Sequence, residues 1–300
     1  MMEELYKVVK QKLEDELSLL EDKPEETIDS TIKALWYKAI GTALSAEKAS
    51  VLPLVKLSDH QKIAFQQLLN IRLGGLPLAY LTERQAFMGI DFLSDKRALI
   101  PRKETEILGK AALELCHKIA ERKSIINVFD VCCGSGNLGL ALAYLNQNTQ
   151  IHSSDLSDEA VELTYENILF LDLNRRVKVL QSDLFSNFES TDFWGKIELI
   201  VCNPPYISTS KVSKMTPEIA ANEPAIAFDG GIVGLKIIQR LIQESPKFLS
   251  EEGWLIFEVG VGQGPFALHI CEKSGLYKLI TSVADNLGNI RVIAACKKNN

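Results

Sequence analysis

Residues 125–139 read IINVFDVCCGSGNLG, an apolar run that passes into a turn of small residues and then into the helical pattern LALAYL. Glycines in such a turn let the backbone approach a ligand closely, and the helix that follows presents its free N–H groups to that ligand. This order predicts a strand, a binding loop and a helix. The loop is expected to consist of Cys132, Cys133, Gly134, Ser135 and Gly136.

Further apolar, strand-like runs follow this unit and alternate with helical stretches. Strands alternating with helices are typical of a mostly parallel sheet that is covered by helices on both faces. We therefore expect an α/β fold over residues 105–300. The predicted strands are residues 125–131, 150–155, 177–183, 197–203, 253–260, 277–284 and 290–296.

Residues 1–72 contain helical patterns only. An apolar stripe extends from Ile32 to Leu44 at helical spacing, and Ser58 with Gln61 forms a capping box for the next helix, which Gly74 and Gly75 would end. These patterns predict a small helical bundle.

Residues 76–104 lose the helical period and read as a connector with two extended pieces, LPLAYL (76–81) and AFMGIDFL (86–93). We expect a helical domain at 1–75, a linker with a short β-hairpin at 76–104 and a catalytic domain at 105–300.

A carboxylate at the end of the next predicted strand points to the kind of ligand. Asp155 follows Gly136 by nineteen residues and can accept hydrogen bonds from both hydroxyls of a ribose. On the third strand, Asp183 is placed to meet an adenine amino group while Leu184 packs on its face. These residues predict an adenosine-containing ligand.

The spacing of Gly134, Gly136 and Gly139 also fits GxGxxG, so a dinucleotide-dependent oxidoreductase has to be considered. Two features argue against it. Asp130 ends the strand before the glycines, and the second half of the chain carries a different motif in place of another mononucleotide-binding unit.

That motif is Asn203-Pro204-Pro205-Tyr206, directly after the run IELIVC. Ligands sit at the carboxyl ends of strands in open α/β sheets, and two prolines fix the backbone there and remove its donors. The nitrogen of an amide or an aromatic amine is a poor nucleophile; the Asn203 side-chain oxygen and the Pro204 carbonyl can accept its two hydrogens, and Tyr206 can lie against the planar group.

Composition limits the partners. The 300 residues include 46% hydrophobic and 24% charged residues and carry a net charge of −6, which argues against a broad phosphate-binding face. Residues 1–60 hold 12 acidic and 8 basic side chains, either a solvated helical face or a docking surface for a basic partner.

The remaining residue types indicate a cytoplasmic protein without a metal. No apolar run reaches the roughly 18 residues of a membrane span, and the charged N-terminus differs from a signal peptide. The six cysteines lack CxxC pairs and neighbouring histidines, so we expect buried free thiols.

With these motifs the sequence resembles the HemK-type glutamine N5-methyltransferases of peptide chain release factors. The resemblance extends from about residue 73 to 296. It rests on GGLPLAYL, FMGIDF, IPRKETE, DVCCGSGN, SSDLS, QSDLF, IVCNPPYIS, NEPAIAFDGG, GWLIFEVGVGQG and DNLGNIRVI.

The resemblance implies a class I S-adenosylmethionine-dependent methyltransferase, Rossmann-like with a seven-stranded sheet, and an N-terminal helical domain that recognises the substrate. It also implies that residues 203–206 hold a glutamine, in release factors the one in a Gly-Gly-Gln loop. IPRKETE is more similar to the release-factor branch than to the ribosomal-protein branch. Two positions depart from the family pattern, because Cys132 and Glu83 stand where glycine is common.

The expected reaction is direct transfer of the methyl group of S-adenosylmethionine to the side-chain amide nitrogen, without a general base. One alternative is a nucleic-acid adenine N6-methyltransferase, which would extrude its base and would need basic surface for phosphates. Another is a protein that binds the cofactor or its partner without turnover. No direct nucleic-acid or membrane binding is expected.

Overall fold

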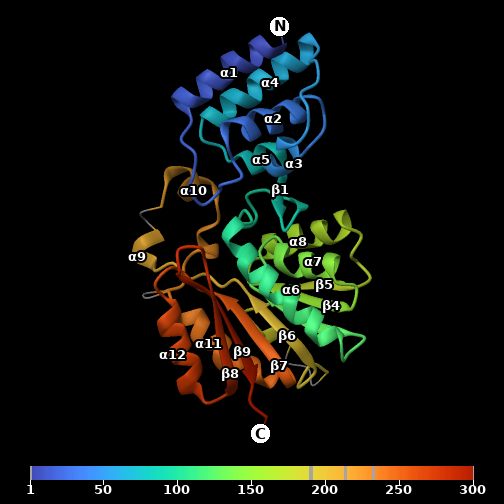
Figure 1. The fold of residues 1–300 in the computed structure, drawn as a ribbon, viewed down its shortest axis with the longest axis vertical. Coiled ribbons are helices and arrows are strands. Elements are labelled where there is room, and N and C mark those ends of the chain that lie inside the picture. Colours follow the sequence, from blue (N-terminus) through green and yellow to red (C-terminus); the bar gives the residue numbers. More distant parts are fainter. Residues whose placement is uncertain (1, 189–191, 213–214, 232–233, 300) are drawn as a thin grey trace. The chain divides into compact units, whose positions relative to one another are not determined.

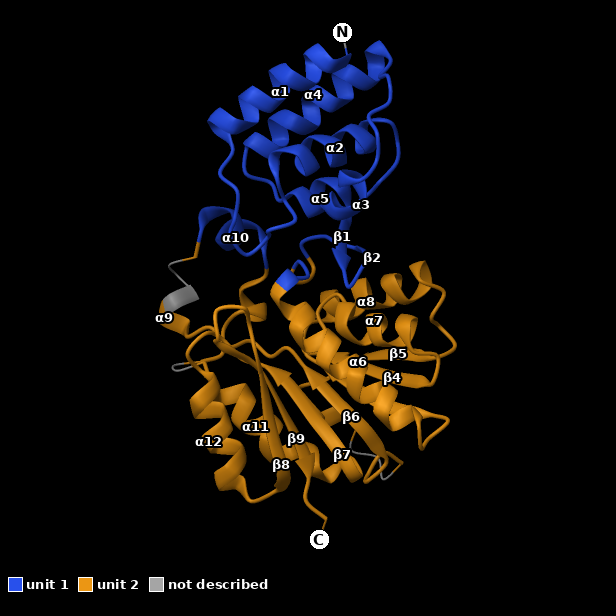
Figure 2. Ribbon diagram, viewed as in Figure 1, with its two compact units in different colours: residues 1–96, 100–103, 216–223 blue, residues 97–99, 104–215, 224–300 orange. Residues whose placement is uncertain are grey.

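The computed structural model describes residues 2–188, 192–212, 215–231 and 234–299 (Figure 1). The chain forms two compact units (Figure 2). The first comprises residues 1–96, 100–103 and 216–223, and the second comprises residues 97–99, 104–215 and 224–300. A short segment from the C-terminal half of the sequence therefore belongs to the first unit.

The first unit is a helical bundle with one hairpin. Its centre is Trp36, which is fully buried and contacts Phe65 edge to face at a centroid distance of 5.1 Å. The predicted capping box is confirmed, because Ser58 Oγ accepts from Gln61 N and Gln61 Oε1 accepts from Ser58 N. Its elements are α1 (Met2–Glu16), α2 (Ile28–Ala39), α3 (Ala46–Ser50), α4 (Asp59–Leu73), α5 (Leu78–Thr82), β1 (Arg84–Phe87), β2 (Ile90–Leu93) and α10 (Pro217–Asn222).

Two sequence-based expectations in this unit are wrong. The apolar stripe predicts a helix to Leu44, but α2 ends at Ala39 because Gly41 adopts φ +88 and turns the chain. The piece LPLAYL, expected to be extended, forms helix α5 after Pro77, whose ring presets the backbone at a helix start. The piece AFMGIDFL does form the expected antiparallel hairpin, β1 with β2.

Buried charges hold α10 in the first unit. Arg72, on α4, is almost fully buried and pairs with Glu218 of α10 at 2.8 Å and with Glu26 at 3.4 Å. Arg102 pairs with Glu223 at 2.6 Å. Removing one member of a buried ion pair leaves an uncompensated charge, so loss of any one of these side chains should destabilise the unit.

The second unit is built on a seven-stranded sheet with the order β5-β4-β3-β6-β7-β9-β8. All neighbouring strands are parallel except at β9, which runs antiparallel to both β7 and β8. This confirms the predicted mostly parallel sheet. The strands are β3 (Ile126–Val131), β4 (Thr149–Asp155), β5 (Val177–Gln181), β6 (Ile197–Cys202), β7 (Leu249–Glu258), β8 (Tyr277–Ala284) and β9 (Ile290–Lys297).

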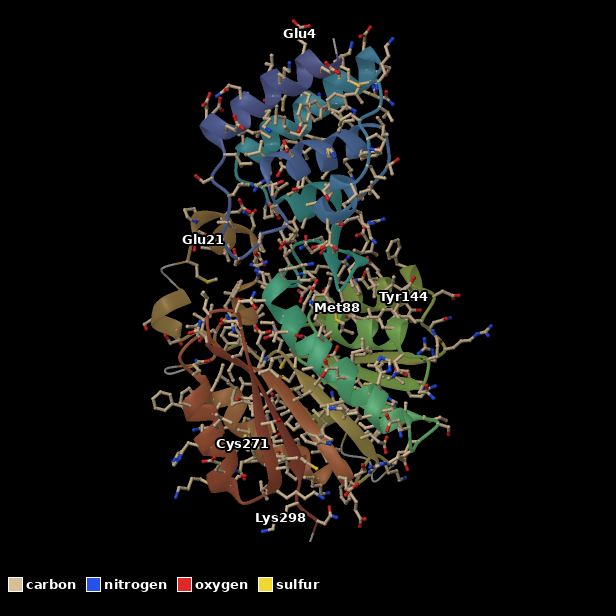
Figure 3. All side chains as sticks on the ribbon, viewed as in Figure 1. Glu4, Glu21, Met88, Tyr144, Cys271 and Lys298 are labelled. Atoms are coloured by element: carbon tan, nitrogen blue, oxygen red, sulfur yellow. The ribbon has the colours of Figure 1, made fainter. Side chains whose placement is uncertain are left out.

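Helices cover both faces of the sheet. Successive side chains of β3 point to opposite faces, so neighbouring residues contact different helices. Asp130 bonds to Gly139 of α7, whereas Phe129 points to the opposite face and joins the apolar cluster that contains Ile238 of α11 and Cys271 of α12. Cys271 is labelled in Figure 3. The helices of this unit are α6 (Glu106–Ala120), α7 (Asn137–Leu145), α8 (Asp158–Phe170), α9 (Thr209–Val212), α11 (Lys236–Glu244) and α12 (Gly264–Ser274).

Among the described residues, no helix combines the length and apolar character needed to cross a lipid bilayer. The cysteines are free thiols, and all except Cys132 are buried.

Candidate active site

The predicted binding loop joins β3 to α7 through left-handed backbone. Cys132, Gly134 and Gly136 have φ of +58, +58 and +78. A Cβ on Gly136 would come within 2.8 Å of a methyl group of Thr164, so only glycine fits there, whereas a Cβ on Gly134 would meet nothing within 4 Å. The loop thus packs tightly against Thr164 at Gly136 and leaves open space next to Gly134.

Cys132 adopts a left-handed conformation, which explains why glycine is common at this position in the family. Glycine adopts positive φ without the steric cost that a Cβ brings. Glu83, the other departure, has φ +58 at the end of α5. Both positions therefore have a backbone reason for the glycine that is common there.

Asp130 fastens the loop to the sheet. Its Oδ2 accepts a 2.9 Å hydrogen bond from Gly139 N, in the first turn of α7. Burial raises the pKa of this carboxyl to about 8. Because it is only 1% exposed and its oxygen is engaged with the helix, Asp130 supports the loop from within and does not face the ligand side.

Asp155 ends β4 beside the same loop. Its Oδ2 accepts from Gly134 N at 2.8 Å and its Oδ1 accepts from Ser157 N at 3.0 Å, while burial raises the pKa of the group. Each carboxylate oxygen retains a lone pair after these bonds, and the residue is partly exposed. An acceptor of this kind next to the open space above Gly134 fits the ribose of an adenosine-containing ligand.

Asp183 and Leu184 lie just beyond β5. Asp183 is about half exposed, and its Oδ1 accepts a 2.7 Å bond from Arg240 Nη1. Leu184 has φ +50 and is 4% exposed within the apolar cluster. Their predicted contacts with adenine stay predictions, and Arg240 competes for the Asp183 carboxylate.

Residues 203–206 lie next to the loop because of strand register. Val131 pairs with Cys202 between the parallel strands β3 and β6. The binding loop starts at Cys132 and the NPPY motif at Asn203, the residues that directly follow these two strands. Both segments therefore start at the carboxyl ends of neighbouring strands. The structure thus brings both predicted motifs together.

Two neighbouring residues hold the polar side chains of this motif. Asn203 Nδ2 donates to Thr105 Oγ1 at 3.2 Å, and the Tyr206 hydroxyl lies 3.3 Å from Glu104 Oε1 and 2.9 Å from Glu258 Oε1. Arg291 approaches Glu104 at 3.0 Å and neutralises part of this acidic pair. Burial, with the nearby Glu258 and Glu104, raises the Tyr206 pKa well above its ordinary value.

Backbone contacts enclose the motif as well. A Cβ on Gly234 would clash with the Tyr206 carbonyl oxygen, and one on Gly230 would lie 2.6 Å from the Pro205 carbonyl oxygen. Gln263 donates from Nε2 to the Tyr206 carbonyl at 2.8 Å and accepts from Gly260 N at 3.0 Å. These contacts hold the backbone carbonyls of Pro205 and Tyr206 in place.

Comparison with known proteins identifies the family of this chain. The family model described as methyltransferase small domain matches residues 108–231. A release factor glutamine methyltransferase of Clostridium botulinum is 34% identical over 260 residues, which cover 86% of this chain and 89% of that protein. The chain belongs to the release factor glutamine methyltransferase family.

A second branch is also similar. The ribosomal protein uL3 glutamine methyltransferase of Francisella tularensis is 31% identical over 237 residues, covering 77% of this chain and 73% of that protein. The crystal structure of the hMettl16 catalytic domain in complex with MAT2A 3'UTR hairpin 1 has a TM-score of 0.55 at 15% identity, and the match covers 89% of this chain and 90% of that one. That likeness shows the class I methyltransferase fold.

Membership in this family establishes the enzyme class. The chain is an S-adenosylmethionine-dependent protein glutamine methyltransferase. The loop around Gly134 and the Asp155 carboxylate fit that cofactor, since they offer an open glycine turn and a ribose acceptor side by side.

Sequence reasoning gave no role to several residues that the structure places around the motif. All except Gly234 lie in stretches that support the family resemblance, namely IPRKETE, NEPAIAFDGG, GWLIFEVGVGQG and DNLGNIRVI, but spacing alone does not reveal which strand end each one reaches. The residues are Glu104, Thr105, Gly230, Gly234, Glu258, Gln263 and Arg291.

Proposed function

We propose that this enzyme methylates the N5 nitrogen of the glutamine in the Gly-Gly-Gln loop of peptide chain release factors. The observation that carries the proposal is the orientation of Asn203, whose Nδ2 is bonded to Thr105. This leaves Oδ1, an acceptor, for the hydrogens of a substrate amide. Similarity to the release-factor relatives and the IPRKETE stretch support this substrate over uL3.

The chain positions the nitrogen and the bound cofactor supplies an electrophilic methyl group. Asn203 Oδ1 and the Pro204 carbonyl accept the two amide hydrogens, and the Tyr206 ring supports the amide plane. With the cofactor bound, the amide nitrogen would bond to the methyl carbon as the carbon–sulfur bond breaks, and one N–H proton would pass to solvent water. The products are N5-methylglutamine and S-adenosylhomocysteine.

No general base is assigned. Tyr206 is held in its neutral form by burial and by the two carboxyl groups beside it, which leaves it unsuited to take a proton. Orientation alone can contribute effective molarities of about 10⁵ M or more in well-aligned systems. The rigid enclosure of residues 203–206 supplies that orientation.

Space for a peptide lies beside Tyr206. A pocket of about 740 Å³ opens there, and its wall includes Leu235, Val261 and Phe266. Val261 and Phe266 are 63% and 65% exposed. An apolar wall next to a planar group suits a protein loop better than a charged nucleic-acid backbone.

We further propose that the N-terminal helical domain selects the protein partner. Glu14, Asp15 and Glu16 are exposed on α1, consistent with a basic partner. Changing all three to Lys is expected to raise KM for a full-length release factor several-fold and leave KM for a short Gly-Gly-Gln peptide unchanged. The matched control changes three exposed acids of the second unit, Glu121, Glu251 and Glu272, to Lys.

The substrate is tested by incubating the enzyme with radiolabelled S-adenosylmethionine and, in separate reactions, a release factor, that factor with alanine in place of the Gly-Gly-Gln glutamine, uL3, and DNA or RNA. Label is expected only on the unaltered release factor, with mass spectrometry locating one methyl group on the glutamine. Label on uL3 alone would show that the substrate is uL3 and not a release factor. Label on adenine would support the nucleic-acid alternative.

A further inference from the structure

Glu104 and Thr105 are consecutive residues in the short 3-10 turn that precedes α6. One contacts the hydroxyl of Tyr206 and the other the amide of Asn203. A single turn therefore reaches both polar side chains of the NPPY motif, although about 100 residues of sequence separate the turn from the motif.

The amide of Asn203 has a donor end and an acceptor end, and only the acceptor can orient a substrate N–H group. The hydroxyl of Thr105 can both donate and accept. Its contact with Asn203 therefore selects one amide orientation only if the hydroxyl hydrogen is committed elsewhere.

Glu258 offers that commitment. It ends β7, is 1% exposed, and accepts from the Tyr206 hydroxyl through Oε1. Its Oε2 is buried with no close hydrogen-bond partner in the part of the chain that the structure describes. The Tyr206 hydroxyl contacts both Glu258 and Glu104, the residue before Thr105, which brings Thr105 to the same carboxylate. The Thr105 hydroxyl accordingly lowers the pKa of Glu258 by stabilising its charged form.

A buried acceptor without a donor is costly, so the Thr105 hydrogen is stabilised when it points to the carboxylate. The Thr105 oxygen then accepts from Asn203 Nδ2, and Asn203 Oδ1 faces the reaction space. In this chain of hydrogen bonds, Glu258 thus determines which way Thr105 donates, and Thr105 determines which end of the Asn203 amide faces the reaction space.

We propose that Thr105 and Glu258 are positioning residues that set the orientation of the Asn203 amide in methyl transfer. The inference rests on the proposed role of Asn203. Neither residue contacts the substrate amide, and both act through a chain of hydrogen bonds.

This arrangement makes turnover depend on the charge of Glu258. Its neighbours are Glu104, Arg291, Tyr206 and Thr105; burial and Glu104 raise its pKa to about 7, while Thr105, Arg291 and Tyr206 oppose the rise. When Glu258 takes up a proton it can itself donate to Thr105, which frees the Thr105 hydrogen to bond Asn203 Oδ1. We therefore expect kcat to fall as the pH drops through about 7.

The test compares Thr105→Val, Thr105→Ser and Glu258→Gln on a release-factor substrate between about pH 5.5 and 9. Loss of one orienting hydrogen bond predicts roughly a 10-fold lower kcat for Thr105→Val, with KM for S-adenosylmethionine within about twofold. Thr105→Ser keeps the hydroxyl and should recover most of the rate. The decline near pH 7 should disappear in both Thr105→Val and Glu258→Gln.

Thr149→Val is the matched control. Thr149 is buried at the start of β4, the end opposite Asp155. Its hydroxyl donates to the Asn146 carbonyl at 2.9 Å, so the control loses a comparable hydrogen bond away from the motif. Its kcat and pH profile should match the parent. Thermal unfolding of all variants separates loss of fold from loss of positioning.

The outcomes distinguish the two proposals. If Asn203→Ala loses activity while Thr105→Val and Glu258→Gln keep the parental kcat and pH profile, the positioning chain is wrong and the role of Asn203 stands. If Asn203→Ala keeps its activity, the proposed role of Asn203 fails first. If Thr105→Val does not fold, Glu258→Gln with a parental pH profile still overturns the inference.

Discussion

The side-chain amide of Gln263 donates a 2.8 Å hydrogen bond to the backbone carbonyl of Tyr206, and the same side chain accepts from Gly260 N. Gln263 is the N-cap residue of α12 (Gly264–Ser274), so this bond ties the NPPY turn to the start of that helix.

Gln263→Ala should loosen the Tyr206 carbonyl and lower kcat roughly 10-fold, since one hydrogen bond of about 1.5 kcal/mol is lost where orientation controls the rate. Gln263→Glu should be no better, because a carboxylate cannot donate to a carbonyl. Steady-state kinetics and cofactor titration check this, with the exposed Gln147→Ala as control. Parental kcat in both Gln263 variants would show that the bond is dispensable.

Asn203→Ala removes the proposed acceptor and should reduce kcat by roughly 10²-fold while cofactor affinity survives. Asn203→Asp keeps the shape and adds a negative charge near the sulfonium, so cofactor binding should tighten as turnover falls. Both are measured on a glutamine-bearing release factor. Activity within about threefold of the parent in either variant would mean that Asn203 does not orient the nucleophile.

Asp155→Ala should weaken binding of S-adenosylmethionine by about 1.5–3 kcal/mol, the range for hydrogen bonds to a charged acceptor. Because Gly134 N donates to the same carboxylate, the loop also loses a brace. Calorimetry checks the affinity, with the exposed Asp158→Ala as control. Unchanged affinity in Asp155→Ala would place the ribose elsewhere.

The buried carboxyl of Asp130 predicts a dependence of stability on pH. Its pKa is about 8 in the folded protein and about 4 in an unfolded chain, so between these values the folded state holds the extra proton and stability falls as pH rises. Asp130→Asn cannot titrate and keeps an acceptor for Gly139 N. Its unfolding free energy should fall less steeply, by up to about 1.4 kcal/mol per pH unit.

Urea unfolding from about pH 5.5 to 8.5 measures that slope, and the exposed Asp59→Asn should reproduce the parental profile. Parallel profiles for the parent and Asp130→Asn would show that Asp130 is already ionised in the folded protein.

Glu83→Gly should stabilise the protein by about 0.5–1 kcal/mol. A non-glycine residue in the left-handed region costs about 1–2 kcal/mol, whereas the exposed ion pair of Glu83 with Lys38 contributes at most about 1 kcal/mol. Glu83→Ala loses the ion pair and keeps the Cβ, so it should bring no gain. Denaturant midpoints decide between them, and equal midpoints for the Gly and Ala variants would contradict a backbone origin.

The fold class and the main motifs could be predicted from the sequence. Alternating strand and helix patterns, the turn from Cys132 to Gly136, and NPPY after a buried strand are local signals. The mostly parallel sheet confirms the prediction drawn from the first of them. The helix boundaries at Ala39 and Leu78 could not be read from apolar spacing, because Gly41 and Pro77 outweigh the pattern through backbone conformation.

The sheet, the glycine turn at residues 132–136 and the family could be predicted from the sequence alone, since short-range periodicity and spacing encode them. Which distant residues meet could be seen only in the folded chain: Thr105 with Asn203, Glu258 with Tyr206, Gln263 with the Tyr206 carbonyl, and Arg72 with Glu218 of α10. Such pairs depend on strand register and on where the chain crosses the sheet. Those are properties of packing over long separations, which no local pattern contains.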